Sequence, residues 1–336
     1  MNLHRSTPSP APAFARLVRA TALVLALFSP IWPCQAQQTY PAKPVHLILG
    51  LPAGGGADVI ARLVAQELSQ TLGQPVLVEN RPGASGVIAA DAVAKAPADG
   101  YTLLFGGSSL VLPPAFGKPL PHDPVADFAP ISRVASVPTV LVAGSQMPFR
   151  SVPELVAYSR SHPGEVNYAS SGNGSSLHLF MEMFKLQTGM QATHVPYKGG
   201  VQASPDLIKG RIHTMFEILP TQIANIQAGK VRALAITSAR RNDQVPDVPT
   251  MREAGLPDFE VGIWYGLYAP AHIPASIQET LHGAITRALA SSSLQQRLKQ
   301  LGAEATPSSA AELARWQRLE LERWTQVIRS SGATSE

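Results

Sequence analysis

The stretch Leu51-Pro52-Ala53-Gly54-Gly55-Gly56-Ala57-Asp58 lies between an apolar run, residues 45–50, and an amphipathic run, residues 58–72. This order predicts a strand, a tight turn and a helix. Three successive glycines allow positive φ and let a ligand contact the main chain directly. The first N–H groups of a helix lack acceptors, so the turn suits a phosphate or carboxylate. A glycine cluster is equally typical of a turn that needs glycine for packing alone, and both interpretations stay open at this point.

The alternation of strand and helix continues along the chain from this turn. Apolar strands are predicted at residues 75–79 and 101–105, with a helix at 87–95 between them. Such alternation predicts an α/β fold with a parallel sheet, and ligands sit beyond the carboxyl ends of its strands. Prolines are frequent between residues 113 and 138, which we interpret as a connection to a second lobe, and a further strand is expected at 139–143.

A second turn of similar composition, residues 170–176, precedes a helix predicted at 177–188. Its sequence, Ser-Ser-Gly-Asn-Gly-Ser-Ser, repeats the organisation of the 51–58 turn and adds hydroxyl groups. Two such turns, each opening a helix in its own lobe, predict an anion site between the lobes. The C-terminal helix predicted at 310–330 is expected to pack on the first lobe, with its tryptophans in the core.

The N-terminus has the features of an export signal. Arg5, Arg16 and Arg19 precede or flank an apolar segment, residues 20–28, that is too short to span a bilayer. We expect residues 1–36 to be the signal peptide, with cleavage after Ala36 and a periplasmic location. Cleavage would remove the only cysteine, and the loss of three arginines would lower the formal charge from +4 to +1. Without a basic patch, the sequence gives no indication of nucleic-acid binding.

The sequence gives little support for a metal or a cofactor. The histidines are scattered, without a pair at ligand spacing. Gly54 and Gly56 fit the start of a dinucleotide fingerprint, but its third small residue would fall on Val59. No Gly-Lys-Ser/Thr follows the turn, so it is no phosphate-binding Walker motif. We therefore expect neither a metal nor a cofactor.

An exported α/β serine hydrolase is the alternative from a different functional class. Serine-rich turns face the predicted cleft, but the residue between Gly172 and Gly174 is Asn173, where a nucleophile elbow has serine. His178 lies one turn into the next helix, and no acid partner can be assigned to it. A receptor binds its solute without turnover, whereas a hydrolase would release product.

The sequence resembles the Bug family, the extracytoplasmic solute receptors of tripartite tricarboxylate transporters. The similarity extends over the mature chain and is most specific in residues 79–86 (Glu-Asn-Arg-Pro-Gly-Ala-Ser-Gly) and 95–104 (Lys-Ala-Pro-Ala-Asp-Gly-Tyr-Thr-Leu-Leu). Further matching blocks are His194-Val195-Pro196-Tyr197-Lys198-Gly199, Met215-Phe216 and Trp264-Tyr265-Gly266-Leu267. The resemblance implies a two-lobed periplasmic binding protein of the Venus-flytrap, type II-like class, without catalytic activity. The expected lobes are residues 37–140 plus 263–336 and residues 141–262.

The resemblance also implies which residues bind the solute. Its carboxylate would lie between the helix-initiating loops, and the residues carried over from the family are Ala53, Gly54, Gly55, Ala57 and Asp58 in the first loop, Gly107 and Ser108 after the third strand, and Ser170, Ser171, Gly172, Gly174 and Ser175 in the second lobe. Glu217 either accepts a ligand ammonium or hydroxyl group or is a structural acid. The expected partners are a small carboxylated solute and the membrane subunits of a tripartite tricarboxylate transporter, with the receptor a monomer. A sensing role without a transporter is also compatible with the sequence.

Overall fold

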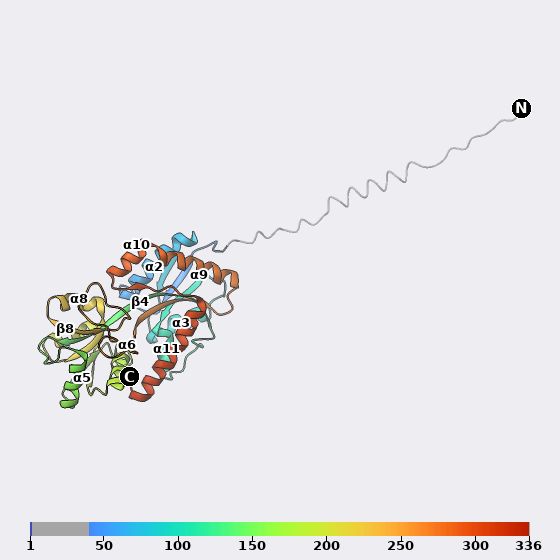
Figure 1. The fold of residues 1–336 in the computed structure, drawn as a ribbon. Coiled ribbons are helices and arrows are strands. Elements are labelled where there is room, and N and C mark those ends of the chain that lie inside the picture. The colour runs from blue at the N-terminus through green and yellow to red at the C-terminus, as the bar shows by residue number, and fades with distance from the viewer. Residues whose placement is uncertain (2–39, 336) are drawn as a thin grey trace. The chain divides into compact units, whose positions relative to one another are not determined.

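The computed structural model describes Met1 and residues 40–335 of the chain (Figure 1). The predicted export signal and its cleavage after Ala36 lie outside the described residues, apart from Met1. The described residues from Tyr40 onward form one continuous unit. Within this described part, no helix combines the length and apolarity needed to cross a membrane.

Three parallel strands begin the sheet. β1 (Val45–Leu49) lies between β2 (Val76–Asn80) and β3 (Thr102–Gly107), with parallel pairing on both sides. β1 and β3 are largely apolar because helices cover both faces of the sheet at this point. β9 (Gly262–Pro270) pairs antiparallel with β3. The parallel sheet predicted from alternating strands and helices is confirmed for these three strands.

One long strand, β4 (Phe128–Gly144), joins the two halves of the sheet. Up to Pro138 it pairs with β9, and from Thr139 it pairs antiparallel with β7 and β8. We call β1, β2, β3, β9 and this first part of β4 the first sheet half, to which a short strand, β10, is added. The bounds of the remaining partners of β4 are β7 (Thr214–Ile218), β8 (Val231–Ile236) and β10 (Glu304–Ala305).

The second sheet half contains the remaining strands. β5 (Asn167–Ser170) pairs parallel with both β7 and β6 (Thr193–Pro196). The order across the whole sheet is β2-β1-β3-β9-β4-β7-β5-β6, with β8 and β10 beside β4. The chain therefore builds two sheet halves that are linked by β4 on the way out and by the segment before β9 on the way back.

The structure differs from the prediction between residues 108 and 138. This segment contains a helix, α4 (Ser108–Ala115), and the strand β4 starts at Phe128, eleven residues before the predicted start at 139. Prolines obscured both elements, because Pro113 and Pro114 lie inside α4. Pro130 lies beside a register irregularity of β4, a place where a strand tolerates a missing N–H group.

Helices cover both halves of the sheet (Figure 1). In the first half, α2 presents Ile60, Leu63, Val64 and Leu68 to a core that α9 and α10 share. The helical bounds are α2 (Gly56–Leu72), the 3-10 turn η1 (Ala84–Gly86), α3 (Val87–Ala94), α5 (Val152–Ser161), α6 (Ser176–Thr188), α7 (Gly200–Ile208), α8 (Leu219–Gln227), α9 (Ala275–Ala290), α10 (Ser292–Gln300) and α11 (Ala310–Ser331).

The C-terminal helix α11 contacts both sheet halves. It packs on α4 and β4 and also on α6, where the Trp324 and Phe180 rings stack with centroids 5.4 Å apart. Trp324 is buried and donates from its indole nitrogen to Glu320, which also accepts from Trp264. The expected core position is confirmed for Trp324, whereas Trp316 is half-buried at the edge of the core. The packing of α11 is also wider than the first-lobe contact that we predicted.

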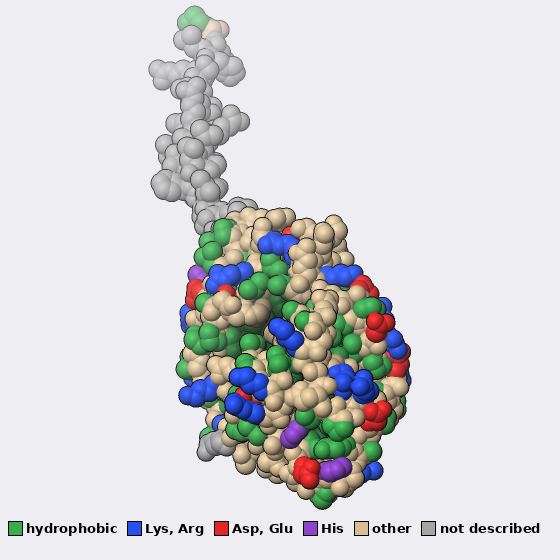
Figure 2. All heavy atoms as spheres, turned by 90° about the vertical axis from the view of Figure 1, so that its left-hand side faces the viewer, with side chains coloured by type: hydrophobic (Ala, Val, Ile, Leu, Met, Phe, Trp, Pro, Cys, Tyr) green, Lys and Arg blue, Asp and Glu red, His purple; other side chains and the backbone are tan. Residues whose placement is uncertain are grey.

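Charged side chains are distributed over the face shown in Figure 2. Lys and Arg side chains are scattered on it, interspersed with Asp and Glu. This face therefore has no continuous basic surface of the kind that steers polyanions toward a protein.

Candidate functional site

One cavity of about 590 Å³ is lined by residues from both sheet halves. The first half contributes the ends of β1 and β3, the start of α4, η1 and the start of β9, and the second half contributes the turn before α6 and Ile218. Among the predicted site residues, Gly107, Ser108, Gly174 and Ser175 line this cavity. The structure thus brings the turn after β3 and the turn after β5 together at one site, beyond the carboxyl ends of both strands.

The turn after β3 places the start of α4 in the cavity wall. Gly107 is required there, because a Cβ atom at this position would lie 2.2 Å from the main-chain oxygen of Trp264 on β9. Ser108 is the first residue of α4, and the first N–H groups of a helix have no acceptor within the helix. The positive end of the α4 dipole therefore faces the cavity.

The turn after β5 is held by its own hydrogen bonds. Ser175 caps α6, since its hydroxyl accepts from the His178 N–H (3.2 Å) and donates to the Gly172 carbonyl (2.7 Å). The Gly174 N–H donates to Nδ1 of His178 (3.1 Å). Gly174 has a φ of 68°, and a Cβ there would meet Ser335 at 2.7 Å. The N–H groups of Ser176 and Leu177 are left without an acceptor inside the helix, which creates a second place for an anion.

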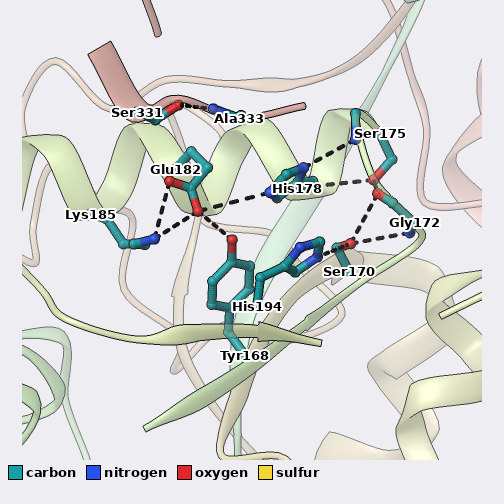
Figure 3. Close-up of polar contacts among 11 residues, drawn as sticks. Tyr168, Ser170, Gly172, Ser175, His178, Glu182, Lys185, His194, Ser331 and Ala333 are labelled. Carbon is teal, nitrogen blue, oxygen red and sulfur yellow. Dashed lines mark hydrogen bonds and ion pairs between the residues drawn. The ribbon is translucent and has the colours of Figure 1, made fainter. Parts of the chain in front are cut away.

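Buried aromatic and charged side chains lie beneath this second turn (Figure 3). The imidazoles of His178 and His194 stack with centroids 4.0 Å apart, and His194 Nε2 lies 2.7 Å from the Ser170 hydroxyl. Glu182 contacts His178 (3.9 Å), the Tyr168 hydroxyl and Lys185. Burial lowers the pKa of His178 and lowers the pKa of His194 to about 4. Both rings are therefore neutral near pH 7, which leaves Nδ1 of His178 able to accept from Gly174.

The first predicted loop lies elsewhere. Ala53, Gly54 and Gly55 are exposed and are not among the described residues that line the cavity, whereas Leu51 lines it. Ala57 is buried in the core of the first half. The first loop therefore borders the cavity only where it leaves β1.

Asp58 is buried and fully engaged in hydrogen bonds. Its carboxylate accepts from the Gly54 N–H, from Arg62 and from Asn80, each at 2.9 Å. The hydrogen bond from Arg62 is the largest of the effects that lower the pKa of Asp58 to about 2. Because these contacts use both carboxylate oxygens, Asp58 fixes the shape of the first loop.

The other predicted residues of the second lobe lie behind the cavity wall. Ser170 is 1% exposed, and its hydroxyl contacts His194 and Gly172. Ser171 and Gly172 are half-buried and are not among the lining residues that the structure describes. Glu217 is buried beside the start of α7, where a Cβ on Gly200 would lie 1.5 Å from its Oε2. Burial raises the pKa of Glu217 to about 7, and its Oε1 accepts from the Ile218 N–H.

Comparison with known proteins identifies the family. The sequence model described as the tripartite tricarboxylate transporter family receptor matches residues 60–333. The chain belongs to this receptor family. Among curated relatives, BugT from Bordetella pertussis is 40% identical over 299 residues, covering 88% of this chain and 91% of BugT. The resemblance to the Bug family that the sequence indicated is thereby confirmed.

Solved structures of the family have the same fold. The periplasmic binding protein BugD is 33% identical with a TM-score of 0.72, covering 88% of this chain and all of that one. A Rhodopseudomonas palustris protein with adipate is 36% identical with a TM-score of 0.75, over 88% of this chain and 99% of that one. MatC from the same organism, with bound malate, is 35% identical with a TM-score of 0.71, over 86% of this chain and all of that one. The protein is a two-lobed solute-binding receptor.

Membership of the receptor family decides against the serine-hydrolase alternative. The structure does place a serine and a histidine at hydrogen-bond distance, Ser170 and His194. Ser170 is buried, however, and its hydroxyl also contacts the main chain at Gly172. A nucleophile must reach its substrate, so this pair is part of the support for the second turn.

Several lining residues were missed by sequence reasoning. They are largely apolar and come from segments that carry no polar motif. Six of them are Phe105, Leu112, Phe116, Ile218, Ile263 and Tyr265. Ala84 and Ser85 also line the cavity, and the sequence carried a signal for them, because they lie in the family block at 79–86. In the structure both have positive φ (47° and 55°). Strained turns of this kind cluster at binding sites.

Proposed function

We propose that this receptor captures a small carboxylate-containing solute between two lobes, residues 37–140 plus 263–336 and residues 141–262, and delivers it to the membrane subunits of a tripartite tricarboxylate transporter. In this proposal the protein is exported to the periplasm, is cleaved after Ala36 and acts as a monomer. One observation carries it: helix starts from the two sheet halves, those of α4 and α6, line the same cavity.

The carboxylate is held by main-chain N–H groups and hydroxyls. Gly107 and Ser108 lie on the first side. On the second side the Gly174 N–H and the Ser175 hydroxyl already donate within the turn, so the N–H groups of Ser176 and Leu177 at the start of α6 are the donors. Each helix start carries roughly half a positive charge, and charge-assisted hydrogen bonds strengthen when water is excluded. A ligand that bridges the two lobes favours their closed arrangement over the open one.

The residues outside the cavity lining take supporting parts in the proposal. Asp58 holds the first loop, with Ala53, Gly54, Gly55 and Ala57 around it, and Ser170, Ser171 and Gly172 belong to the base of the second turn. Family members with adipate and with malate show that dicarboxylates bind to relatives of this chain, which supports a carboxylate as the recognised group.

Calorimetric titration of the purified protein with carboxylates and with their uncharged amides tests whether the receptor binds a carboxylate. We expect carboxylates to bind and amides not to bind. Gly174→Val, which adds atoms against Ser335 and Phe116, should weaken binding by about tenfold or more. Gly229→Val is the matched control, since Gly229 has a similar φ of 64° with nothing within 4 Å of an added Cβ. Equal binding of amides, or equal affinities of the two variants, would contradict the proposal.

Uptake by cells tests the transport part. Cells that lack this chain should lose uptake of the carboxylate identified by titration, and supplying the chain again should restore it. Unchanged uptake would contradict delivery to a transporter and would leave sensing as the role of the receptor.

A further inference from the structure

The wall of the cavity is apolar around its two helix starts. Phe105, Leu112 and Phe116 contribute on one side, and Ile218, Ile263 and Tyr265 contribute from β7 and β9. The Phe105 and Tyr265 rings stack, with centroids 5.1 Å apart and planes 21° apart. Phe105 is almost fully buried and Tyr265 is half-buried, so the Tyr265 ring is the one that offers a flat surface to a ligand ring or chain.

Charge is scarce in the same wall. Lys118 is the only charged side chain among the described residues that line the cavity, and it is exposed. An exposed lysine keeps its ammonium group hydrated and pairs weakly with an anion. The other polar lining residues, Ser85, Ser109, Asn173, Ser176 and Ser335, are uncharged. The two helix starts account for one carboxylate, and a second one placed against phenylalanine and leucine would lose its hydration without a buried charged partner.

The Tyr265 hydroxyl is the polar group within this aromatic wall. It has no hydrogen-bond partner among the described residues, and Tyr265 is half-buried in the cavity. Burial raises the pKa of Tyr265 to about 12, so the hydroxyl stays protonated near pH 7. A neutral hydroxyl can satisfy one polar substituent or a water molecule, but it cannot neutralise a second negative charge.

We propose that the natural solute of this cavity is a monocarboxylate with an apolar body, an aromatic ring or a hydrocarbon chain, instead of a short dicarboxylate. The inference rests on the proposed function, because it assumes that the helix starts hold a carboxylate. A cavity of about 590 Å³ has room for such a body beside the anion, and small-ligand sites combine mostly apolar walls with a few placed polar groups.

Titration with matched pairs of ligands tests the inference. Hexanoate and adipate share a six-carbon chain and differ in one carboxylate, while phenylacetate and malate contrast an aromatic body with a polar one. The purified protein should first be unfolded and refolded to remove any retained solute. We expect hexanoate and phenylacetate to bind about tenfold or more tightly than adipate and malate. Hexanamide and phenylacetamide are the uncharged controls.

The outcomes separate the inference from the proposed function. Equal or tighter binding of adipate or malate would overturn the inference and leave a carboxylate receptor in place. Absence of binding by every carboxylate, or equal binding of the amides, would overturn the proposed function and the inference with it.

A variant locates the apolar contact. Phe116→Ala should weaken phenylacetate binding by about fivefold or more and leave adipate binding nearly unchanged. Leu319→Ala, on the exposed side of α11 and outside the lining, is the matched control. The melting temperature of each ligand-free variant shows whether it is folded.

If Phe116→Ala does not fold, the ratio of the affinities of the unmodified protein for hexanoate and adipate decides the question. Equal losses for phenylacetate and adipate in a folded Phe116→Ala protein would contradict the apolar contact.

Discussion

The two glycine-containing turns at residues 51–58 and 170–176 resemble each other in sequence and differ in what they do in the structure. Both follow a strand and open a helix, α2 or α6. The second turn lines the cavity, whereas the glycines of the first are exposed outside it. Strand order explains the difference: β3 and not β1 adjoins the strands that connect the two sheet halves, so the turn after β3 takes the position facing the second half.

The two turns are also stabilised in different ways. A buried carboxylate, that of Asp58, holds the first turn through charged hydrogen bonds. A serine cap and a stacked pair of neutral imidazoles hold the second turn (Figure 3). A glycine-rich turn can thus be recognised from sequence, but its role depends on which side chains remain free to face a ligand.

Removing the support of the first turn should have the largest effect on stability. Asp58→Asn should lower the free energy of unfolding by about 2 kcal/mol near pH 7, because the pKa of Asp58 falls from 3.8 to about 2 on folding. This contribution is present above the unfolded-state pKa and is lost as the pH falls toward 2. Urea unfolding at several pH values measures it, with the exposed Asp247→Asn as control. The two proteins should become similar in their free energy of unfolding as the pH falls. A difference between Asp58→Asn and the unmodified protein that stays constant in acid would contradict the assigned role of Asp58.

The stability that the second turn contributes should instead be lost at less acidic pH. The pKa of His194 falls from 6.5 to about 4 on folding, so stability is fully present above about pH 6.5 and declines as the pH falls toward 4. We expect a loss of about 1–2 kcal/mol over this range in urea unfolding, less than the full pKa difference would give, because His194 is only half-buried and solvent screens its charge. His194→Asn should remove most of this pH dependence, and the exposed His272→Asn should leave it unchanged. Identical profiles for the two variants would show that the imidazole pair does not titrate as described.

Loss of the cap of α6 should have a smaller effect on stability, together with weaker binding. Ser175→Ala removes the acceptor of the His178 N–H and should lower the free energy of unfolding by about 1 kcal/mol. Ser291→Ala is the matched control, since the Ser291 hydroxyl caps α10 by accepting from the Leu294 N–H and Ser291 lies outside the cavity lining. Solute affinity should fall in Ser175→Ala only. Equal affinities in both variants would remove Ser175 from the binding turn.

The smallest change in solute affinity is expected for a substitution in the first turn. Gly54→Val, at a φ of 81° with nothing within 4 Å of an added Cβ, should change solute affinity by less than about twofold. Titration beside Gly174→Val makes the comparison direct. A loss in Gly54→Val similar to that in Gly174→Val would return the first loop to the ligand contacts.

The sequence predicts local elements well where apolar periodicity is strong. The helix expected at 58–72 is found at Gly56–Leu72, and the strand expected at 45–50 is found at Val45–Leu49. The prediction failed where prolines mask an element, as in α4 and the first part of β4. The apolar wall was not predictable, because Tyr265 reaches Phe105 only through the non-local pairing of β3 with β9, and Phe116 follows α4, a helix that the sequence did not predict.

A crystal structure of the protein with phenylacetate or hexanoate bound tests the central claim most directly. We predict that the carboxylate lies about 3 Å from main-chain N–H groups at the starts of both α4 and α6, directly or through one water molecule. We also predict that its apolar body lies against Phe116 and Tyr265. A carboxylate bound to residues 53–57, or to one sheet half alone, would contradict a site made by the two helix starts.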